Sequence, residues 1–405
     1  MSVHKYEEVP GGITAALGYK ASGVAAGVKY VGKKDIAVIY SECEAAAAGV
    51  FTTNAVKAAP VLLDMERVAL GRARAIVVNS GNANACNGRR GMEDALAMTA
   101  EAARLLGIPE ESILVSSTGV IGQPMPMDRV IPGIRAAVEA LSEKGGRDAA
   151  EAIMTTDIEL KESAVRFQSG GKTVTVGAMA KGSGMIHPNM ATMLCFITTD
   201  AAVDPACLRE CLTYAADRSF NMVTVDGDTS TNDMVLALAN GMAGNSEIKS
   251  GGEGFLAFRE ALTYVCMALA KAVARDGEGA TKLIEVRVVN ALTERDAGLA
   301  ARSVTASSLF KAAVFGQDAN WGRILCAAGY SGAQFNPGVV DIYLGGVQVA
   351  KDGAGLTFDE EAAAAALAGD TVQVLIDLKE GSYGACAWGC DLTYEYVKIN
   401  GSYRT

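Results

Sequence analysis

Apolar side chains recur at helical spacing in five stretches of the chain. The clearest stretch covers residues 92–106, where Leu96, Ala103 and Leu106 share one face and Gly107-Ile108-Pro109 ends the run. The same periodicity predicts helices at residues 205–218, 256–275, 294–315 and 358–367.

Apolar runs rich in β-branched residues predict strands at residues 36–40, 75–79, 113–116, 173–178, 193–198, 283–289, 339–344 and 372–378. Strands and helices come in blocks rather than in strict alternation. This order favours a layered α/β protein of mixed sheets over a doubly wound parallel fold. A chain of 405 residues exceeds the usual limit of a single core, so one large composite domain or two domains are expected. Residues 241–254 hold five glycines and are predicted to form an exposed loop.

The composition is that of a well-packed cytosolic enzyme. Half of the residues are hydrophobic, 20% are charged and 45 are glycine. The net charge is −10 and no basic run occurs, which argues against a nucleic-acid partner. No stretch of 18 apolar residues and no secretory signal is found. A cytoplasmic protein that does not span a membrane is therefore expected.

Cysteine and histidine usage limits the chemistry. The nine cysteines are scattered and mostly lie in apolar segments, as buried thiols in a reducing compartment do. Cys386 and Cys390 have neither a second pair nor a nearby histidine, so no metal site is predicted. The only histidines are His4 and His187, which excludes a three-histidine metal site and leaves His187 as the one imidazole for a Ser-His-Asp triad. Neither a dinucleotide fingerprint nor a G-x4-G-K-[ST] phosphate loop is present, so no such cofactor is expected.

The most unusual segment runs from Ala180 to Cys195. A glycine-rich turn passes through His-Pro-Asn and enters an apolar strand that opens with Ala191-Thr192. Threonine at the start of a strand is usually structural, because β-branched residues favour strands. If the peptide bond before Thr192 is cut, however, its freed α-amine can act as general base for its own hydroxyl, and no histidine is needed. The small Ala191 would let that hydroxyl approach the carbonyl at the cut.

A second segment of interest, residues 115–122, is a strand that runs into a turn of small residues around Thr118 and Gly119. Such a turn exposes a backbone N–H and a hydroxyl together, which are the parts of an oxyanion hole. A plain strand-to-loop turn explains the same residues, and the segment alone favours this explanation.

The whole chain resembles the ornithine acetyltransferase (glutamate N-acetyltransferase) family. The resemblance rests on ordered matches that include Asn79-Ser80-Gly81-Asn82-Ala83-Asn84-Ala85-Cys86, Met154-Thr155-Thr156-Asp157 and Asp276-Gly277-Glu278-Gly279-Ala280-Thr281-Lys282. Further matches are residues 48–54, 116–122, 181–186, 191–194 and 318–323.

The resemblance implies a precursor that cuts itself between Ala191 and Thr192 into an α chain, residues 1–191, and a β chain, residues 192–405, which stay together. It implies a layered sandwich of mixed β-sheets flanked by helices, shared with the DmpA-type hydrolases and similar to N-terminal-nucleophile enzymes. It places the nucleophile at Thr192 and the oxyanion hole at Thr118 and Gly119, and it implies neither cofactor nor metal. The implied substrate contacts are Thr155, Lys181, Thr192, Glu278, Asn400 and Thr405.

Two of these implied contacts, Lys181 and Glu278, have a physical rationale, and two others depend on a condition. Lys181 can bind a substrate carboxylate, and Glu278, between two glycines that allow a close backbone approach, suits a substrate ammonium. Chain ends are usually disordered, so a role for Asn400 and Thr405 requires that the C-terminal segment folds back over the site.

The reaction implied by the resemblance is a ping-pong transfer of acetyl from N2-acetyl-L-ornithine to L-glutamate through acetyl-Thr192. The nearest alternative is an N-terminal-threonine amidase or aminopeptidase on the same scaffold, and a non-catalytic binding module is a third. An α2β2 heterotetramer is the suggested assembly. Acetyl-CoA as a second donor and feedback regulation are left open.

Overall fold

A computed structural model of the chain describes residues 6–187 and 193–402. Its contacts divide the chain into two compact units. The first unit comprises residues 1–182, 188–217 and 229–269, and the second comprises residues 183–187, 218–228 and 270–405. Each unit therefore takes residues from both sides of position 191.

The first unit is built on a nine-stranded sheet in the order β1-β6-β7-β8-β10-β3-β4-β5, with β2 paired to β3. The sheet is mixed, because β8 and β10 pair in parallel, as do β4 and β5, whereas the other neighbours are antiparallel. Its strands are β1 (Glu7–Glu8), β2 (Tyr19–Val24), β3 (Ile36–Phe51), β4 (Arg72–Asn79), β5 (Ile113–Ser117), β6 (Lys161–Ser169), β7 (Lys172–Lys181), β8 (Leu194–Thr199) and β10 (Met234–Ala239).

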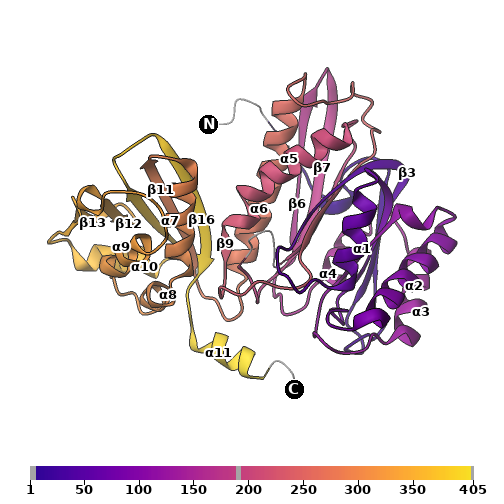
Figure 1. The fold of residues 1–405 in the computed structure, drawn as a ribbon, viewed down its shortest axis with the longest axis horizontal. Coiled ribbons are helices and arrows are strands. Elements are labelled where there is room, and N and C mark those ends of the chain that lie inside the picture. The colour runs from indigo at the N-terminus through magenta and orange to yellow at the C-terminus, as the bar shows by residue number, and fades with distance from the viewer. Residues whose placement is uncertain (1–5, 188–192, 403–405) are drawn as a thin grey trace. The chain divides into compact units, whose positions relative to one another are not determined.

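Helices cover this sheet and enclose two apolar clusters. In one cluster, Met98 of α2 and Ile134 of α3 pack with Val77 of β4, and α2 and α3 lie side by side in Figure 1. In the other, Ala149 of α4 packs with Phe196 of β8. The helices are α1 (Ala59–Val68), α2 (Gly88–Leu106), α3 (Met127–Glu139), α4 (Gly146–Ala152), α5 (Pro205–Asp217) and α6 (Phe255–Arg275), and the boundary between the units falls within α6.

The second unit has a seven-stranded mixed sheet in the order β14-β13-β12-β15-β11-β16-β9. Helix α7 packs on β11 and β16 of this sheet. The strands are β9 (Val223–Thr224), β11 (Leu283–Ala291), β12 (Asp341–Leu344), β13 (Val347–Lys351), β14 (Ala354–Gly355), β15 (Thr371–Asp377) and β16 (Tyr383–Cys390). The helices are α7 (Glu294–Ala306), α8 (Ser308–Phe315), α9 (Trp321–Gly329), α10 (Glu360–Ala368) and α11 (Tyr394–Gly401).

The predicted class, a layered α/β fold of mixed sheets flanked by helices, is confirmed, and residues 241–254 form a loop as expected. The single helix predicted for residues 294–315 is wrong. It is interrupted at Ser307, whose backbone is extended and whose hydroxyl accepts the Phe310 N–H at 3.3 Å. Ser307 thus caps a new helix, because a serine side chain satisfies one of the amides that a helix start leaves unbonded.

Strand β3 is much longer than the predicted strand at residues 36–40. Its second half is Glu44-Ala45-Ala46-Ala47-Ala48-Gly49, and alanine has little strand preference. This half is extended because β10 pairs with it, for example Ala46 with Ala239, and because β4 pairs with Ala45 and Ala46. In the described ranges 6–187 and 193–402, no helix is long and apolar enough to cross a membrane.

Candidate active site

The first candidate site segment is the turn after β5. Thr118 is half-buried, and its backbone N–H donates a hydrogen bond to the Asn79 carbonyl at 2.9 Å. Among the described residues, no hydrogen bond of the Thr118 hydroxyl is found. The donor that Thr118 can offer a ligand is therefore its hydroxyl, and its amide is already used.

Gly119 brings the backbone of this turn against residues 81 and 82. Its φ angle is +139°, in the region that L side chains rarely adopt. A Cβ atom at this position would lie 2.8 Å from the Asn82 nitrogen and 2.9 Å from the Gly81 carbonyl carbon. Glycine is thus required both by the backbone conformation and by the close approach.

Buried asparagines hold the turn in place. The Asn79 side chain, on a fully buried residue, donates to the Ser117 hydroxyl at 2.7 Å and accepts the N–H groups of Gly81 and Asn82 at 3.1 and 3.0 Å. Asn232, just before β10, donates to the Ser117 carbonyl at 2.8 Å. Ser117, the residue before Thr118, is therefore held through its hydroxyl by Asn79 and through its carbonyl by Asn232.

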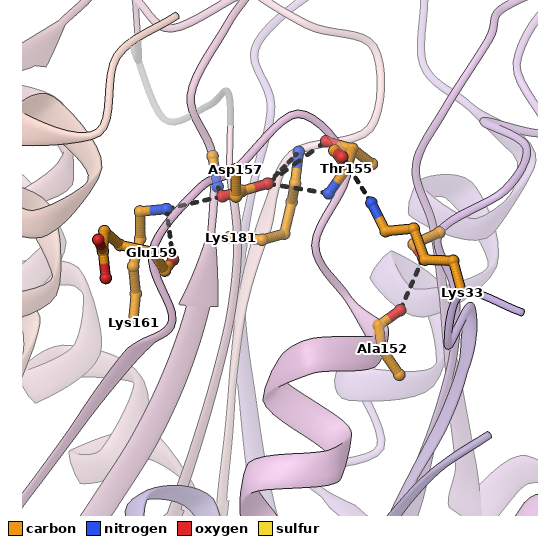
Figure 2. Close-up of polar contacts among 9 residues, drawn as sticks. Lys33, Ala152, Thr155, Asp157, Glu159, Lys161 and Lys181 are labelled. Carbon is orange, nitrogen blue, oxygen red and sulfur yellow. Dashed lines mark hydrogen bonds and ion pairs between the residues drawn. The ribbon is translucent and has the colours of Figure 1, made fainter. Parts of the chain in front are cut away.

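A second group of polar residues surrounds Asp157, between α4 and β6. The Asp157 carboxylate accepts the Gly182 N–H at 2.6 Å and the Thr155 N–H at 2.9 Å (Figure 2). Its oxygens also lie 2.8 Å from the Lys161 ammonium and 4.0 Å from the Lys181 ammonium. Lys181 ends β7 and its side chain is only 10% exposed. Thr155 and Lys181 are thus brought together at one acidic side chain.

Two opposing effects set the charge of Asp157. Burial by itself raises the pKa of this carboxyl group, because it disfavours the charged form. Lys181, Lys161 and the Gly182 N–H act against burial and hold the pKa well below its usual range. Asp157 is therefore a carboxylate at neutral pH, and the two ammonium groups are the reason.

A hydrogen bond links these two segments of the first unit. The Ser80 hydroxyl, in the asparagine-rich turn, donates to the carbonyl of Ala152 at 2.6 Å. Ala152 ends α4, only three positions before Thr155, and appears beside the Thr155 group in Figure 2.

In the second unit, Glu278 meets the C-terminal helix. The Glu278 N–H donates to the Ser183 carbonyl at 2.9 Å, and its carboxylate accepts the Asn400 side-chain amide at 2.8 Å. Asn400 lies on α11, which the Thr393 hydroxyl ties to the Gly279 carbonyl at 2.7 Å. The fold-back of the C-terminal segment that a role for Asn400 requires is present up to this residue.

Gly184 provides the space that Glu278 occupies. A Cβ atom on Gly184 would come within 2.3 to 2.5 Å of three atoms of the Glu278 carboxyl group. A separation this short forces one group to move, so only glycine at position 184 allows Glu278 its observed position.

His187 is engaged through both ring nitrogens. Its Nδ1 lies 3.0 Å from the Thr224 hydroxyl, and the Arg302 guanidinium lies 3.3 Å from its Nε2. Because Arg302 can only donate, Nε2 is the acceptor and the proton of the neutral ring belongs on Nδ1. Burial and then Arg302 lower the pKa of His187, while Asp228 opposes them. The unprotonated ring nitrogen of His187, Nε2, therefore already accepts a hydrogen bond from Arg302.

The family of the chain follows from comparison with known proteins. The model of the ArgJ family matches residues 20–405. The chain belongs to the ArgJ family. The resemblance stated from the sequence motifs is thereby confirmed.

Relatives in the ArgJ family match along nearly the whole chain. The arginine biosynthesis bifunctional protein ArgJ of Symbiobacterium thermophilum is 62% identical over 98% of this chain and 100% of its own length. The protein of the same name from Caldanaerobacter subterraneus subsp. tengcongensis is 55% identical over 98% of this chain and 100% of its own. A crystal structure of the arginine biosynthesis bifunctional protein argJ of Bacillus halodurans is 47% identical, with a TM-score of 0.51, and covers 52% of this chain and 100% of that chain.

The residues assigned from the ArgJ resemblance thus fall into three groups. Thr118 with Gly119 and Thr155 with Lys181 lie in the first unit, and Glu278 with Asn400 lies in the second. Ala191, Thr192 and Thr405 lie outside the described residues.

Five further residues belong to these groups but were not predicted from the sequence. Lys33, Asn232 and Lys161 lie outside the matched motifs. Asn79 and Asp157 lie inside them but had no assigned role. Asn79-Ser80-Gly81-Asn82 has the composition of a turn held by side-chain-to-backbone hydrogen bonds. This composition is the sequence feature from which the structural role of Asn79 could have been predicted.

Proposed function

We propose that this chain is a glutamate N-acetyltransferase of arginine biosynthesis, which transfers acetyl from N2-acetyl-L-ornithine to L-glutamate. The observation that carries the proposal is the match over almost the whole length to a relative at 62% identity that is named an arginine biosynthesis bifunctional protein. The hydroxyl and ammonium groups of the first unit and the carboxylate of the second, each described above within its own unit, support it.

In the proposed reaction, the Thr192 hydroxyl attacks the acetyl carbonyl while its own α-amine takes the proton. The Thr118 hydroxyl and the backbone at Gly119 stabilise the oxyanion. The amide C–N bond then breaks, the proton passes to the departing amine, and ornithine leaves acetyl-Thr192 behind. The amine of glutamate attacks this ester and regenerates the threonine. One amide replaces another, so no ATP is required.

Substrate recognition follows the same residues. The Lys181 ammonium suits the α-carboxylate of the substrate, with Thr155 beside it, and Glu278 suits the side-chain ammonium of ornithine. Asn400 orients Glu278 through the 2.8 Å hydrogen bond, and Thr405 is the proposed contact from the end of the chain.

Self-cleavage before Thr192 is part of the proposal. The solved ArgJ chain from Bacillus halodurans covers 52% of this chain, whereas ArgJ sequences match 98% of it. A half-length polypeptide is what a cut before residue 192 would leave, because that position lies near the middle of the chain. We propose that the α chain 1–191 and the β chain 192–405 remain together in an α2β2 heterotetramer.

The word bifunctional in the names of the relatives favours a second donor, for which we propose acetyl-CoA as co-substrate, without any bound cofactor. We propose the cytoplasm as the location, where both acyl donors and glutamate are available.

The direct test is an acetyl-transfer assay with purified protein, N2-acetyl-L-ornithine labelled in its acetyl group, and glutamate. Labelled N-acetyl-L-glutamate is the expected product. Release of acetate instead would identify the amidase or aminopeptidase alternative. A single full-length band on a denaturing gel, without transfer, would identify a binding module.

The pH dependence of the first half-reaction should identify the general base. An α-amine has a pKa of about 7.7–8.0, which burial lowers, so the rate should rise through an apparent pKa at or below about 8. The pKa of His187 lies below its ordinary value of 6.5, so an imidazole base would give a rise at lower pH. His187→Asn should keep most of its rate. Loss of the ascending limb together with nearly all activity in this variant would make His187 the base.

Gly184→Ala should weaken substrate binding. The added methyl group displaces the Glu278 carboxylate, which we expect to raise KM for N2-acetyl-L-ornithine roughly tenfold, the scale of one misplaced charge-assisted contact. Steady-state kinetics measure the effect. Gly298→Ala in α7 is the control, since its Cβ has a single neighbour within 4 Å, at 3.8 Å, and it should leave KM unchanged. An unchanged KM in Gly184→Ala would remove Glu278 from the substrate site.

A further inference from the structure

One carboxylate connects the two segments of the first unit that the proposed function assigns to the substrate. Asp157 accepts the backbone N–H of Thr155 through one oxygen and the backbone N–H of Gly182 through the other, at 2.9 and 2.6 Å. Gly182 directly follows Lys181. Asp157 therefore fixes the backbone at Thr155 and next to Lys181, although these segments are far apart in the sequence (Figure 2).

Two lysines lie near the Asp157 carboxylate, at different distances. The Lys161 ammonium, on a side chain only 1% exposed, donates to Asp157 at 2.8 Å, while Lys181 at 4.0 Å lies beyond hydrogen-bond distance and interacts through charge alone. Two ammonium groups thus face one buried carboxylate. Lys161 also donates to the Glu159 carbonyl at 3.2 Å, whereas residue Glu159 is exposed. Lys161 is thus the direct hydrogen-bond partner of Asp157, and Lys181 is held near the same carboxylate by charge.

A third cation holds the opposite side of the Thr155 peptide. The Lys33 ammonium donates to the Thr155 carbonyl at 2.7 Å. The backbone of Thr155 is thus fixed at its N–H by Asp157 and at its carbonyl by Lys33. A surface turn does not need both backbone groups of one residue to be held. A residue that binds a ligand does need a backbone held in one position.

We propose that Asp157, held by Lys161, is a positioning residue that presents Lys181 and Thr155 to the α-carboxylate of the amino-acid substrate and makes the enzyme select substrates that carry this group. The identity of the substrate rests on the proposed function. The positioning role of Asp157 and the counter-charge Lys161 are new. The competing explanation is that Asp157 only neutralises the buried Lys161.

The test compares N2-acetyl-L-ornithine with N-acetylputrescine, which is the same molecule without the carboxylate. Wild type should prefer the first by roughly 100-fold or more in kcat/KM. Asp157→Asn keeps the size of the side chain and removes its charge. KM for N2-acetyl-L-ornithine should rise about tenfold while kcat stays within about threefold, and kcat/KM for N-acetylputrescine should change less than about twofold. Equal losses for both substrates would overturn the proposal.

Asp200→Asn is the matched control. Asp200 is also buried in the first unit and accepts two backbone N–H groups, of Leu17 at 3.1 Å and Thr175 at 2.7 Å. Its replacement also removes a buried carboxylate but should leave the preference for the carboxylate-bearing substrate unchanged. The same loss of preference in Asp200→Asn would show that any buried-carboxylate defect produces it, and the proposal would fail.

The double variant Asp157→Asn/Lys161→Met separates the two explanations and serves if the single variant does not fold. It removes the lysine charge whose hydrogen-bonded carboxylate is lost in Asp157→Asn, so thermal stability should return toward wild type. KM for N2-acetyl-L-ornithine should stay high, because Lys181 and Thr155 still lack their anchor. Recovery of the wild-type KM would mean that Asp157 only neutralises Lys161.

Calorimetry of L-ornithine and putrescine binding tests the positioning role without requiring acetyl transfer. Failure of the positioning role can therefore be distinguished from failure of the proposed function. Wild type should bind L-ornithine more tightly, and Asp157→Asn should reduce that difference about tenfold. A wild-type protein that discriminates between these ligands but transfers no acetyl group would refute the proposed function alone. A variant that keeps the wild-type ratio would refute the positioning role alone.

Discussion

Thr192→Ala is expected to leave the chain as one polypeptide of 41.8 kDa and to abolish acetyl transfer. The reason is that a single hydroxyl carries out both steps in the proposed mechanism: it attacks the Ala191 carbonyl during maturation and the acetyl carbonyl during catalysis. Loss of a nucleophile costs about 10⁴-fold or more in turnover. Intact-mass spectrometry and the labelled-acetyl assay measure the two losses on the same preparation.

Thr192→Ser is the matched control, because serine keeps the hydroxyl. It should still be cut and should retain transfer. Thermal unfolding of Thr192→Ala near the wild-type temperature would show that the fold persists. Normal cleavage in Thr192→Ala would instead place the nucleophile elsewhere.

The second large effect is expected for Thr118→Ala, with turnover lowered by roughly 10²–10³, the usual cost of one lost oxyanion donor. The structure makes the prediction more specific than the sequence could, because the Thr118 amide is already bonded to Asn79 and only its hydroxyl remains to donate. KM for N2-acetyl-L-ornithine should change far less than kcat.

Thr118→Ser tests that specific point. It retains a hydroxyl on the same Cβ, so it should recover most of the turnover that alanine loses. If serine and alanine variants are equally slow, the hydroxyl is not the donor. Equal losses in KM and kcat in Thr118→Ala would mean that Thr118 only shapes the turn.

The fold was predictable wherever the local pattern and the tertiary environment agree. The apolar periodicity of residues 256–275 matches α6 within one residue, and the run at 283–289 matches β11 within two. The pattern was misleading in two kinds of place. At Ser307, one capping hydroxyl divides a continuous apolar stripe into α7 and α8. In β3, alanines are extended because strands on both sides supply the hydrogen bonds.

The candidate site was predictable only in part. The motifs were sufficient to identify the family and to point to Thr118, Gly119, Lys181 and Glu278. They gave no indication that Asp157 joins Thr155 to Lys181, because Lys181 and Gly182 reach Asp157 only after β7 pairs with β6. The two strands align Lys161 with Ala180, which brings one lysine from each strand to the same carboxylate.

By itself, the sequence determined the α/β class, through hydrophobic periodicity, and the family, through ordered motifs. It also limited the catalytic options, because two histidines leave little room for imidazole chemistry. The tertiary structure alone decided which groups are buried and charged together: Asp157 with two lysines, His187 with Arg302, and Asn400 with Glu278. The physical reason is that periodicity is a local property of the chain. The cost of burying a charge depends on partners brought from distant positions, and those partners are known only when the chain is folded.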